Sequence, residues 1–294
     1  MIIIKLQGGL GNQMFQYAFG LSRSKELDCP LYFDLSFFER GNPNLTSRNY
    51  ELNVFPVSIN IASDKLINRF FHPTLIRRLI NKSGINRNTV YRENTLRFNK
   101  EVFEIKPPAY FEGFWQNEQY FANWTNLIRE AFIFRYPLNI ESQRIAATLK
   151  ENTVSIHVRR GDYISSKATN ELHGVCTANY YNQAINMMRD KLPDPHFYFF
   201  SDEPDWVKKH LLPTVDNCTL VCRNKDAESW QDMALMSKCK HHVIANSSFS
   251  WWGAWLNPDK EKIVIAPQNW FNKKTDYFDD GDIVPKSWIQ IPND

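Results

Sequence analysis

The chain has 294 residues, of which 43% are hydrophobic and 23% charged, and its formal net charge is +3. These values are typical of a soluble globular protein and exclude an intrinsically disordered or collagen-like chain. A net charge this small gives no general attraction to nucleic acid, so we predict no nucleic-acid partner. The length is sufficient for two domains of ordinary size.

The cellular compartment is predicted from the apolar segments and the cysteines. No segment approaches the ~20 consecutive apolar residues that a membrane-spanning helix requires. The N-terminal MIII meets Lys5 and then a glycine loop, so it has neither the basic nor the apolar region of a signal peptide. The five cysteines are irregularly spaced, which argues against a disulfide framework. We therefore expect a cytoplasmic protein.

The first 35 residues are predicted to alternate strand, helix and strand, and the alternation then stops. A strand over residues 1–6 leads through the glycine loop into a helix over about 12–27, and a second strand follows at 30–35. The pattern then becomes irregular until residues 110–121, which predict a strand that runs into another helix.

Residues 65–100 are strongly basic. Apolar residues interleave with the charges at helical spacing, so a basic amphipathic surface is predicted. Such a surface is either a solvated helix face or a peripheral contact with an anionic membrane. The only acidic residue in this region is Glu93, and the basic residues are Lys65, Arg69, Arg77, Arg78, Lys82, Arg87, Arg92, Arg97 and Lys100.

The second half alternates strand-like and helix-like segments. This alternation predicts a parallel sheet with helices on both faces. We expect an N-terminal domain at 1–145 and a C-terminal domain at 146–294. The predicted strands are 153–158, 196–200, 218–223, 241–245 and 262–267, and the predicted helices are 178–192, 204–212, 227–239 and 249–256.

The glycine loop QGGLGNQ follows the first strand, where α/β sheets bind ligands. Gly9 and Gly11 let the backbone approach a ligand and leave free N–H groups at a helix start, which suits an anion. A tight turn that needs glycine is the structural alternative. Met14 replaces the third glycine of a dinucleotide fingerprint, but Asp34 fits a ribose-binding acid, so a nucleotide-dependent reductase is a competing hypothesis.

The segment SIHVRRGDY places two arginines at the end of a predicted strand. Alternation along the strand directs Arg159 and Arg160 to opposite faces, so only one of them can point directly at a given ligand. Guanidinium is the preferred group for bidentate contact with phosphate. Asp162 is expected to pair with the other arginine, as a structural ion pair.

A second anion site is predicted in NSSFS, where Ser247 and Ser248 come at the entry of a helix. Two anion sites and an arginine pair predict a diphosphate ligand. Asp202, in FSDE, has two interpretations: it caps the helix that Pro204 begins, or it accepts a hydrogen bond from a nucleobase amine.

No metal is predicted. An Asp-x-Asp metal motif is matched only by Asp280-Gly281-Asp282, in a polar run that is better explained as a solvated turn. A zinc site is disfavoured because CTLVC is an apolar strand, whereas a structural zinc site usually has a turn between its ligands. The residues considered for zinc are Cys218, Cys222, Cys239, His241 and His242.

Taken together, four motifs resemble the bacterial galactoside α-1,2-fucosyltransferases of glycosyltransferase family 11. They are LQGGLGNQMFQYAFG, SIHVRRGDY, FYFFSDEPDWV and MALMSKCKHHVIANSSFSWWGAWLN. The resemblance implies a GT-B fold, with two Rossmann-like domains that face each other across a cleft. It also implies metal-independent, inverting transfer of L-fucose from GDP-β-L-fucose to the 2-hydroxyl of a terminal galactose, with the acceptor on the N-terminal domain and the donor on the C-terminal domain.

The resemblance also implies roles for single residues. Arg159 matches the arginine that binds the β-phosphate, Asp202 resembles the acid that reads guanine, and Asn12 matches an asparagine near the reacting centre. His157 and Asp162 are the candidates for a base that deprotonates the acceptor. The expected donor site comprises Gly9, Gly11, Asn12, His157, Arg159, Arg160, Asp202, Ser247, Ser248 and Phe249.

A third hypothesis is a non-catalytic carbohydrate-binding protein. The nine tryptophans exceed what a core usually needs, and exposed indoles serve as platforms for sugars. The alternative is that the tryptophans simply pack in the interior.

Overall fold

The described chain forms two compact units. The computed structural model describes residues 1–40, 48–72, 88–161, 171–172, 174–222, 224, 226–272, 275, 277–278 and 281–294. The first unit is Met1–Ile133 with Gly281–Ile283, and the second is Phe134–Asp280 with Val284–Asp294. The sequence had predicted the boundary between the two domains at residues 145/146. Residues 134–146 pack on the second unit instead, because Phe134 stacks on Trp230 at 5.5 Å and the Asn139 N–H donates to Gln231.

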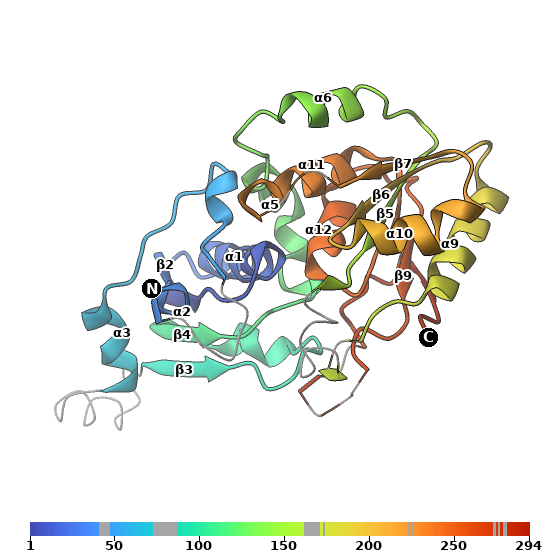
Figure 1. The fold of residues 1–294 in the computed structure, drawn as a ribbon. Helices are drawn as coiled ribbons and strands as arrows, with labels where there is room; N and C mark the ends of the chain where they lie inside the picture. Colours follow the sequence, from blue (N-terminus) through green and yellow to red (C-terminus); the bar gives the residue numbers. More distant parts are fainter. Residues whose placement is uncertain are drawn as a thin grey trace. The chain divides into compact units, whose positions relative to one another are not determined.

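The sheet of the first unit is parallel, with the order β2-β1-β4-β3 among the described residues. Figure 1 labels β2, β4 and β3. Helix α1 (Leu10–Glu26) links β1 to β2, and the chain later returns to the opposite side of β1 with β4. The strand order therefore reverses between β1 and β4. The strands are β1 (Ile2–Lys5), β2 (Leu31–Asp34), β3 (Thr89–Arg92) and β4 (Ala109–Glu112).

Short helical segments complete the first unit. The strand predicted near 110 is confirmed as β4, but the helix after it is broken, because the Asn117 side chain accepts the Gln119 N–H at 2.8 Å and starts a separate 3-10 turn. The described helices and turns are α2 (Ser36–Arg40), η1 (Leu52–Val54), α3 (Asp64–Phe71), η2 (Lys100–Glu104), η3 (Glu118–Tyr120), η4 (Ala122–Trp124) and α5 (Thr125–Ala131).

The basic region is described only in part. Helix α3 packs its apolar residues into the core of the first unit, where Phe70 is buried against the cluster of Ile3 and Tyr110. The apolar face of α3 is thus occupied by protein. Arg92 is paired with Glu112 at 2.9 Å. Arg77, Arg78, Lys82 and Arg87 lie outside the described residues. No helix within the described ranges is long and apolar enough to cross a membrane.

The second unit contains the larger sheet, which is also parallel in every described pairing. Its order is β10-β9-β8-β5-β6-β7 among the described residues, so the chain grows from β5 to one side and then from β8 to the other. The strands are β5 (Thr153–Val158), β6 (His196–Ser201), β7 (Cys218–Val221), β8 (His241–Val243), β9 (Val264–Pro267) and β10 (Ile289–Ile291).

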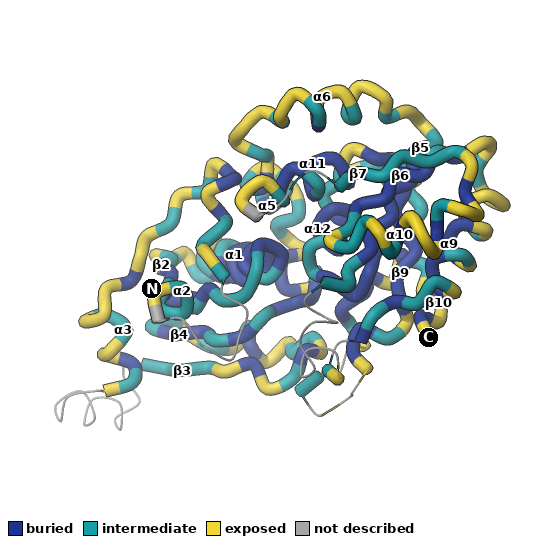
Figure 2. The backbone as a smooth tube through the Cα atoms, viewed as in Figure 1, coloured by how far each residue is buried: buried dark blue, intermediate teal, exposed yellow. Residues whose placement is uncertain are grey.

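Helices and strands alternate in this unit as predicted, and the expected class, α/β with parallel sheets, is confirmed. Sequence did not predict α6 or β10. Figure 2 shows α6 partly exposed, whereas the strands at the centre of the sheet are buried. The described helices and turns are α6 (Ile140–Ala146), α9 (Ala178–Lys191), α10 (Pro204–His210), η5 (Leu212–Thr214), η6 (Asp226–Glu228), α11 (Trp230–Lys238) and α12 (Ser248–Leu256).

A buried polar chain joins the two central strands of this sheet. The His242 ring contacts the Ser155 hydroxyl through Nδ1 at 2.8 Å and the Asn257 amide nitrogen through Nε2 at 3.0 Å. Because that amide nitrogen is a donor, which also donates to the Cys239 carbonyl, Nε2 accepts and Nδ1 carries the proton. Burial, and then the nearby Lys262, hold the pKa of His242 well below its usual value.

Helix α12 is almost entirely buried. Trp251, Trp252 and Trp255 are at most 5% exposed, so the C-terminal carbonyls of the helix have little access to water. The Lys262 ammonium donates to the carbonyls of Ala254 at 2.7 Å and Asn257 at 2.6 Å. A cation at this end also opposes the negative end of the helix dipole.

We predict that Lys262→Met lowers the free energy of unfolding by about 1–3 kcal/mol, because it leaves these carbonyls without their charged donor. Lys260→Met changes an exposed lysine of the same turn and is the matched control, with an expected change within about 0.5 kcal/mol. Urea denaturation followed by circular dichroism measures both. Equal stabilities of the two variants would contradict a capping role for Lys262.

Candidate functional site at the carboxyl ends of the second sheet

The strand order of the second unit reverses between β5 and β8. In open α/β sheets, ligands bind outside the carboxyl ends of the strands at such a reversal. The segment after β5 is Arg159-Arg160-Gly161, and the segment after β8 leads into α12 through Ser247. Two of the predicted motifs therefore emerge at the reversal, on neighbouring strands.

Asp202, which follows β6, holds the segment that follows β5. Its Oδ1 accepts the Arg160 N–H at 3.0 Å, and its Oδ2 accepts the Gly161 N–H at 3.1 Å. Oδ2 also lies 2.9 Å from Arg159 Nη1. A Cβ atom on residue 161 would lie 2.9 Å from Oδ2, so glycine is required for this approach. Asp202 thus fixes both the backbone of this segment and the guanidinium of Arg159.

The interpretation of Asp202 as a helix cap does not hold. The N-cap of α10 is Glu203, with no side-chain hydrogen bond, and Pro204 begins the helix as expected. A carboxylate has about four acceptor positions, of which the described contacts use three. Contact of Asp202 with a nucleobase stays a prediction.

Arg160 is held by partners different from those of Arg159. Its Nε lies 3.3 Å from a Glu203 carboxylate oxygen, and its guanidinium stacks on the Trp206 ring at 4.1 Å. Sequence had paired Arg160 with Asp162, which lies outside the described residues. The described structure shows that the two arginines are supported by two adjacent acids on the neighbouring strand end.

The N-terminus of α12 matches the predicted second anion site in form. Ser247 is the N-cap, and its hydroxyl accepts the Phe249 N–H at 3.3 Å. The first turn contains no acidic residue. Ser248 and Phe249 are half-buried, and the Phe249 ring lies 5.7 Å from the His157 ring. These positions suit an anion, because helix N-terminal N–H groups carry partial positive charge.

His157 is buried and neutral. Burial, and then the Arg159 charge, lower its pKa from 6.5 to about 3. Its Nδ1 has no hydrogen-bond partner within the described part of the chain. A ring with so low a pKa is a weak proton acceptor near neutral pH, which argues against His157 as a general base.

Two tyrosines that sequence reasoning missed support the same strand ends. The Tyr181 hydroxyl donates to the His157 carbonyl at 3.1 Å, and the Tyr180 hydroxyl donates to the Ile244 carbonyl at 2.6 Å. Burial raises the pKa of both tyrosines well above the usual value. Neighbouring side chains on one helix thus satisfy a carbonyl in the last residues of β5 and the carbonyl just beyond β8. The dipeptide Tyr-Tyr in a predicted helix gave no sign of this role.

The glycine loop belongs to the first unit, and a protein carboxylate already contacts its helix N-terminus. Gly9 is the N-cap of α1 and makes no side-chain capping bond, but the Glu51 side chain accepts the Leu10 N–H. Gly11 is buried beside it. Glu51 therefore occupies an N–H group that an external anion would use, and the nearby Arg48 offsets part of its charge. The roles of Gly9 and Gly11 in donor binding stay predictions.

Asp34 is unsuited to bind a ribose. It is 2% exposed, and its Oδ2 accepts the Tyr110 hydroxyl at 2.5 Å while its Oδ1 accepts the Ser36 N–H at 2.8 Å. These contacts hold β2 to β4 and to the start of α2. The reductase hypothesis thus loses its acidic residue.

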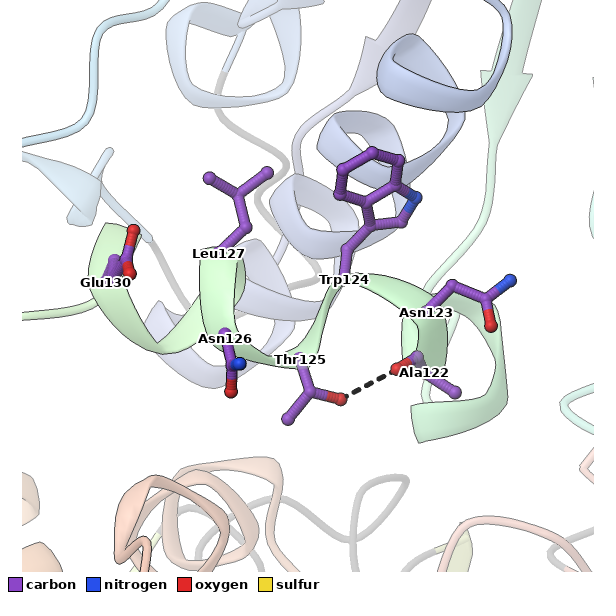
Figure 3. Close-up of a pocket in the computed structure, with 7 residues that line it drawn as sticks. All are labelled: Ala122, Asn123, Trp124, Thr125, Asn126, Leu127 and Glu130. Carbon is purple, nitrogen blue, oxygen red and sulfur yellow. Dashed lines mark hydrogen bonds between the residues drawn. The ribbon is translucent and has the colours of Figure 1, made fainter.

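The tryptophans mainly pack in the interior. Seven of the nine are buried, and Trp124 and Trp206 are half-buried, so none offers a fully exposed platform. A pocket of about 410 Å³ lies over η4 and α5. Figure 3 shows Trp124 and Leu127 on one side of this segment and Thr125 and Asn126 on the opposite side, so the polar groups do not converge. These observations disfavour the binding-module hypothesis.

Two of the residues considered for zinc make other contacts. Cys239 is buried, and its thiol contacts the Leu235 carbonyl, while His242 belongs to the polar chain with Ser155. Within the described ranges, no group of three or more His, Cys, Asp or Glu side chains is placed to hold a metal ion.

Comparison with known proteins agrees with the motifs. A family model described as Glycosyl transferase family 11 matches residues 1–292. Alpha-1,2-colitosyltransferase of Escherichia coli is 35% identical, and the match covers 99% of this chain and 99% of that protein. O-antigen biosynthesis glycosyltransferase WbnK of Escherichia coli is 31% identical over 97% of this chain and 99% of that protein. Human galactoside alpha-(1,2)-fucosyltransferase 1 is 25% identical over 58% of this chain and 50% of its own.

One solved structure with a similar course of the chain is that of NodZ alpha-1,6-fucosyltransferase soaked with GDP-fucose. It has a TM-score of 0.48 and 15% sequence identity, and the match covers 87% of this chain and 92% of that one. Taken with the family model, the parallel sheets and the site at the strand reversal define a glycosyltransferase. The chain belongs to glycosyl transferase family 11, which confirms the resemblance of its motifs.

We predict that His157 makes stability depend on pH. The folded protein keeps the ring neutral down to about pH 3, whereas an unfolded histidine binds a proton below about pH 6.5. Stability is therefore lost as the pH falls below 6.5, and His157 accounts for about 2 kcal/mol of that loss at pH 5. In His157→Gln, the difference in unfolding free energy between pH 7 and pH 5 should be smaller by that amount. Urea denaturation at both pH values measures it, and equal differences in the two proteins would contradict the prediction.

Proposed function

We propose that the protein transfers L-fucose from GDP-β-L-fucose to the 2-hydroxyl of a terminal galactose, with inversion and without a metal ion. The observation that carries the proposal is the position of Arg159, which is fixed by Asp202 at the strand reversal of the second sheet. The N-terminus of α12 follows the adjacent strand. A guanidinium and a helix N-terminus are the groups that would bind the two phosphates of a nucleoside diphosphate.

The chemistry of the transfer makes this site the main source of rate enhancement. As the bond between fucose and GDP breaks, negative charge develops on the departing diphosphate, and preorganised donors stabilise it more than water does. Arg159 is preorganised, because Asp202 holds it before any ligand binds. We assign Arg159, Ser247, Ser248 and Phe249 to the diphosphate and Asp202 to the positioning of Arg159. Arg160 and His157 border this site, Arg160 through Glu203 and Trp206 and His157 through the Phe249 ring.

Of the two candidates for the catalytic base, we do not retain His157. The low pKa of His157 makes the ring a poor acceptor for the acceptor hydroxyl proton. Both arginines have acidic partners other than Asp162, so their positions do not depend on the predicted ion pair with it. We therefore keep Asp162 alone as the candidate base.

A second donor follows from the comparisons. The relative that is 35% identical over 99% of the chain is an alpha-1,2-colitosyltransferase. Colitose is L-fucose without the 3-hydroxyl, so the two donors share the diphosphate and differ at one polar group. A site that hydrogen-bonds this hydroxyl would reject colitose strongly, and a site that does not contact it would accept both sugars.

The decisive experiment offers GDP-fucose and GDP-colitose separately to the protein, with a panel of β-galactosides and with EDTA present. We expect α-1,2-linked product with at least one donor, identified by mass spectrometry and NMR. Product from GDP-colitose alone would replace the proposed sugar and keep the site. The absence of product with either donor would refute the proposal, and activity that requires added Mn²⁺ would refute metal independence.

We predict that Arg159→Lys lowers kcat/KM by about 10²-fold or more, because a point charge cannot reproduce the planar fork of donors. Arg189→Lys is the matched control, since Arg189 lies on the exposed side of α9 and donates to the Thr214 carbonyl. We expect its kcat/KM to stay within about twofold of the wild type. Initial rates with varied donor measure both variants, and near-normal turnover of Arg159→Lys would contradict its phosphate role.

A further inference from the structure

The first unit has a strand reversal of its own, between β1 and β4. The segment after β1 is the glycine loop, and the segment after β4 is Gly113-Phe114-Trp115-Gln116-Asn117. Sequence motifs directed attention only to the first of these. Ligands of α/β sheets bind at such reversals, so the second segment is a candidate part of a binding site.

A buried carboxylate shapes the segment after β4. Glu93 is 8% exposed, and it accepts the N–H groups of Phe114 at 2.7 Å and Trp115 at 3.1 Å. Trp115 has a φ of 57°, a left-handed conformation that is costly for an aromatic residue. A Cβ on residue 113 would lie 2.5 Å from the Glu93 Cβ, so only glycine allows this approach. Glu93 thus holds a strained turn in one conformation.

The turn directs Gln116 to the start of α1. Gln116 Nε2 donates to Asn12 Oδ1 at 2.8 Å. Gln116 is 8% exposed, and its Oε1 is buried without a hydrogen-bond partner in the part of the chain that the structure describes. A buried amide oxygen without a partner costs about 1–3 kcal/mol, so its retention needs an explanation, and a ligand that supplies the missing bond is one.

The charges around this pair indicate the chemistry of the ligand. The Glu51 carboxylate accepts the Leu10 N–H at the start of α1, and the Glu93 carboxylate occupies the turn. The Arg48 guanidinium lies beside Glu51 and offsets part of its charge, so acids and a cation surround the pair and no single sign of charge selects an anionic ligand. Side-chain amides each combine donors with an acceptor, and these suit the hydroxyls of a neutral sugar.

We propose that Gln116 and Asn12 form an amide pair that binds hydroxyl groups of the galactoside acceptor, with Glu93 as the positioning residue for Gln116. Gln116 Oε1 accepts a hydrogen bond from a sugar hydroxyl, and the bond to Asn12 fixes the orientation of both amides. This inference rests on the proposed function, which supplies a neutral glycan as acceptor. The residue it adds to the site is Gln116.

The test compares Gln116→Met with Gln119→Met, its matched control at an exposed position of η3. Methionine keeps the volume of glutamine and removes the unpartnered oxygen. We expect Gln116→Met to lower kcat/KM for the acceptor about 10- to 100-fold. Its KM for the donor and its slow release of GDP by donor hydrolysis without acceptor should stay within about twofold of the wild type. Gln119→Met should match the wild type in all three measurements.

Thermal unfolding separates binding from a structural role. If Gln116 serves a ligand, Gln116→Met should unfold within about 2 °C of the wild type, because the lost bond to Asn12 is offset by removal of the buried oxygen. The proposal would be overturned if Gln116→Met lowered kcat/KM for the acceptor, raised KM for the donor and lowered the Tm together. An unchanged kcat/KM for the acceptor would overturn it as well. Glu93→Gln weakens the hydrogen bonds to the Phe114 and Trp115 N–H groups. It should therefore lower kcat/KM for the acceptor too, but by less than Gln116→Met.

Equilibrium binding keeps this inference separate from the choice of donor. Isothermal titration of the GDP-saturated protein with N-acetyllactosamine should give a Kd for the wild type and a Kd at least 10-fold weaker for Gln116→Met. If no donor is turned over but this difference is observed, the proposed donor fails and the amide pair stands. If product is formed and both proteins bind the glycan equally, the amide pair fails and the proposed function stands.

Discussion

The Asp202 carboxylate is the contact on which the second unit's site depends. It stands at the end of β6 and accepts two backbone N–H groups and one guanidinium from the segment that follows β5. A cation that leaves a buried strand would be costly without a partner, and here the partner comes from the neighbouring strand. The position of Arg159 is thus coupled to the register of the sheet, since β5 and β6 pair from Thr153 to Val158.

In both units, side chains from neighbouring elements hydrogen-bond to the backbone at the ends of the parallel strands. Parallel strands end in N–H and carbonyl groups that need partners, and a ligand site requires those groups to be held without being covered. In the first unit, Glu93 holds the turn after β4. In the second, Asp202 holds the N–H groups after β5, Tyr180 holds a carbonyl after β8, and Tyr181 holds one in the last residues of β5. Acids and tyrosines from neighbouring elements thus satisfy backbone groups at the strand ends of both units.

The parts of the fold that could be predicted are those with local patterns. Long periodic segments such as α1 and α9 and the buried run of β5 were evident, as was Pro204 at the start of α10. The short β3, β10 and α6 carry too few residues for a period to show. The contacts that build the sites are separated by tens of residues: Glu93 is 21 residues from Phe114, and Gln116 is 104 from Asn12. No local spacing signals such a pair, so motifs located the strand ends and named Asp202 and Arg159, but they did not show the contact between these two or the roles of Glu93 and Gln116.

In the polar chain through His242, all hydrogen bonds are donated in the same direction. Asn257 donates to the ring, the ring donates to Ser155, and the Ser155 hydroxyl lies 3.5 Å from the His241 carbonyl. The proton on Nδ1 is sealed from solvent between the two strands that flank the reversal, so it exchanges with water slowly. It is therefore a built-in NMR reporter, whose downfield resonance would follow the separation of β5 and β8 without any added label.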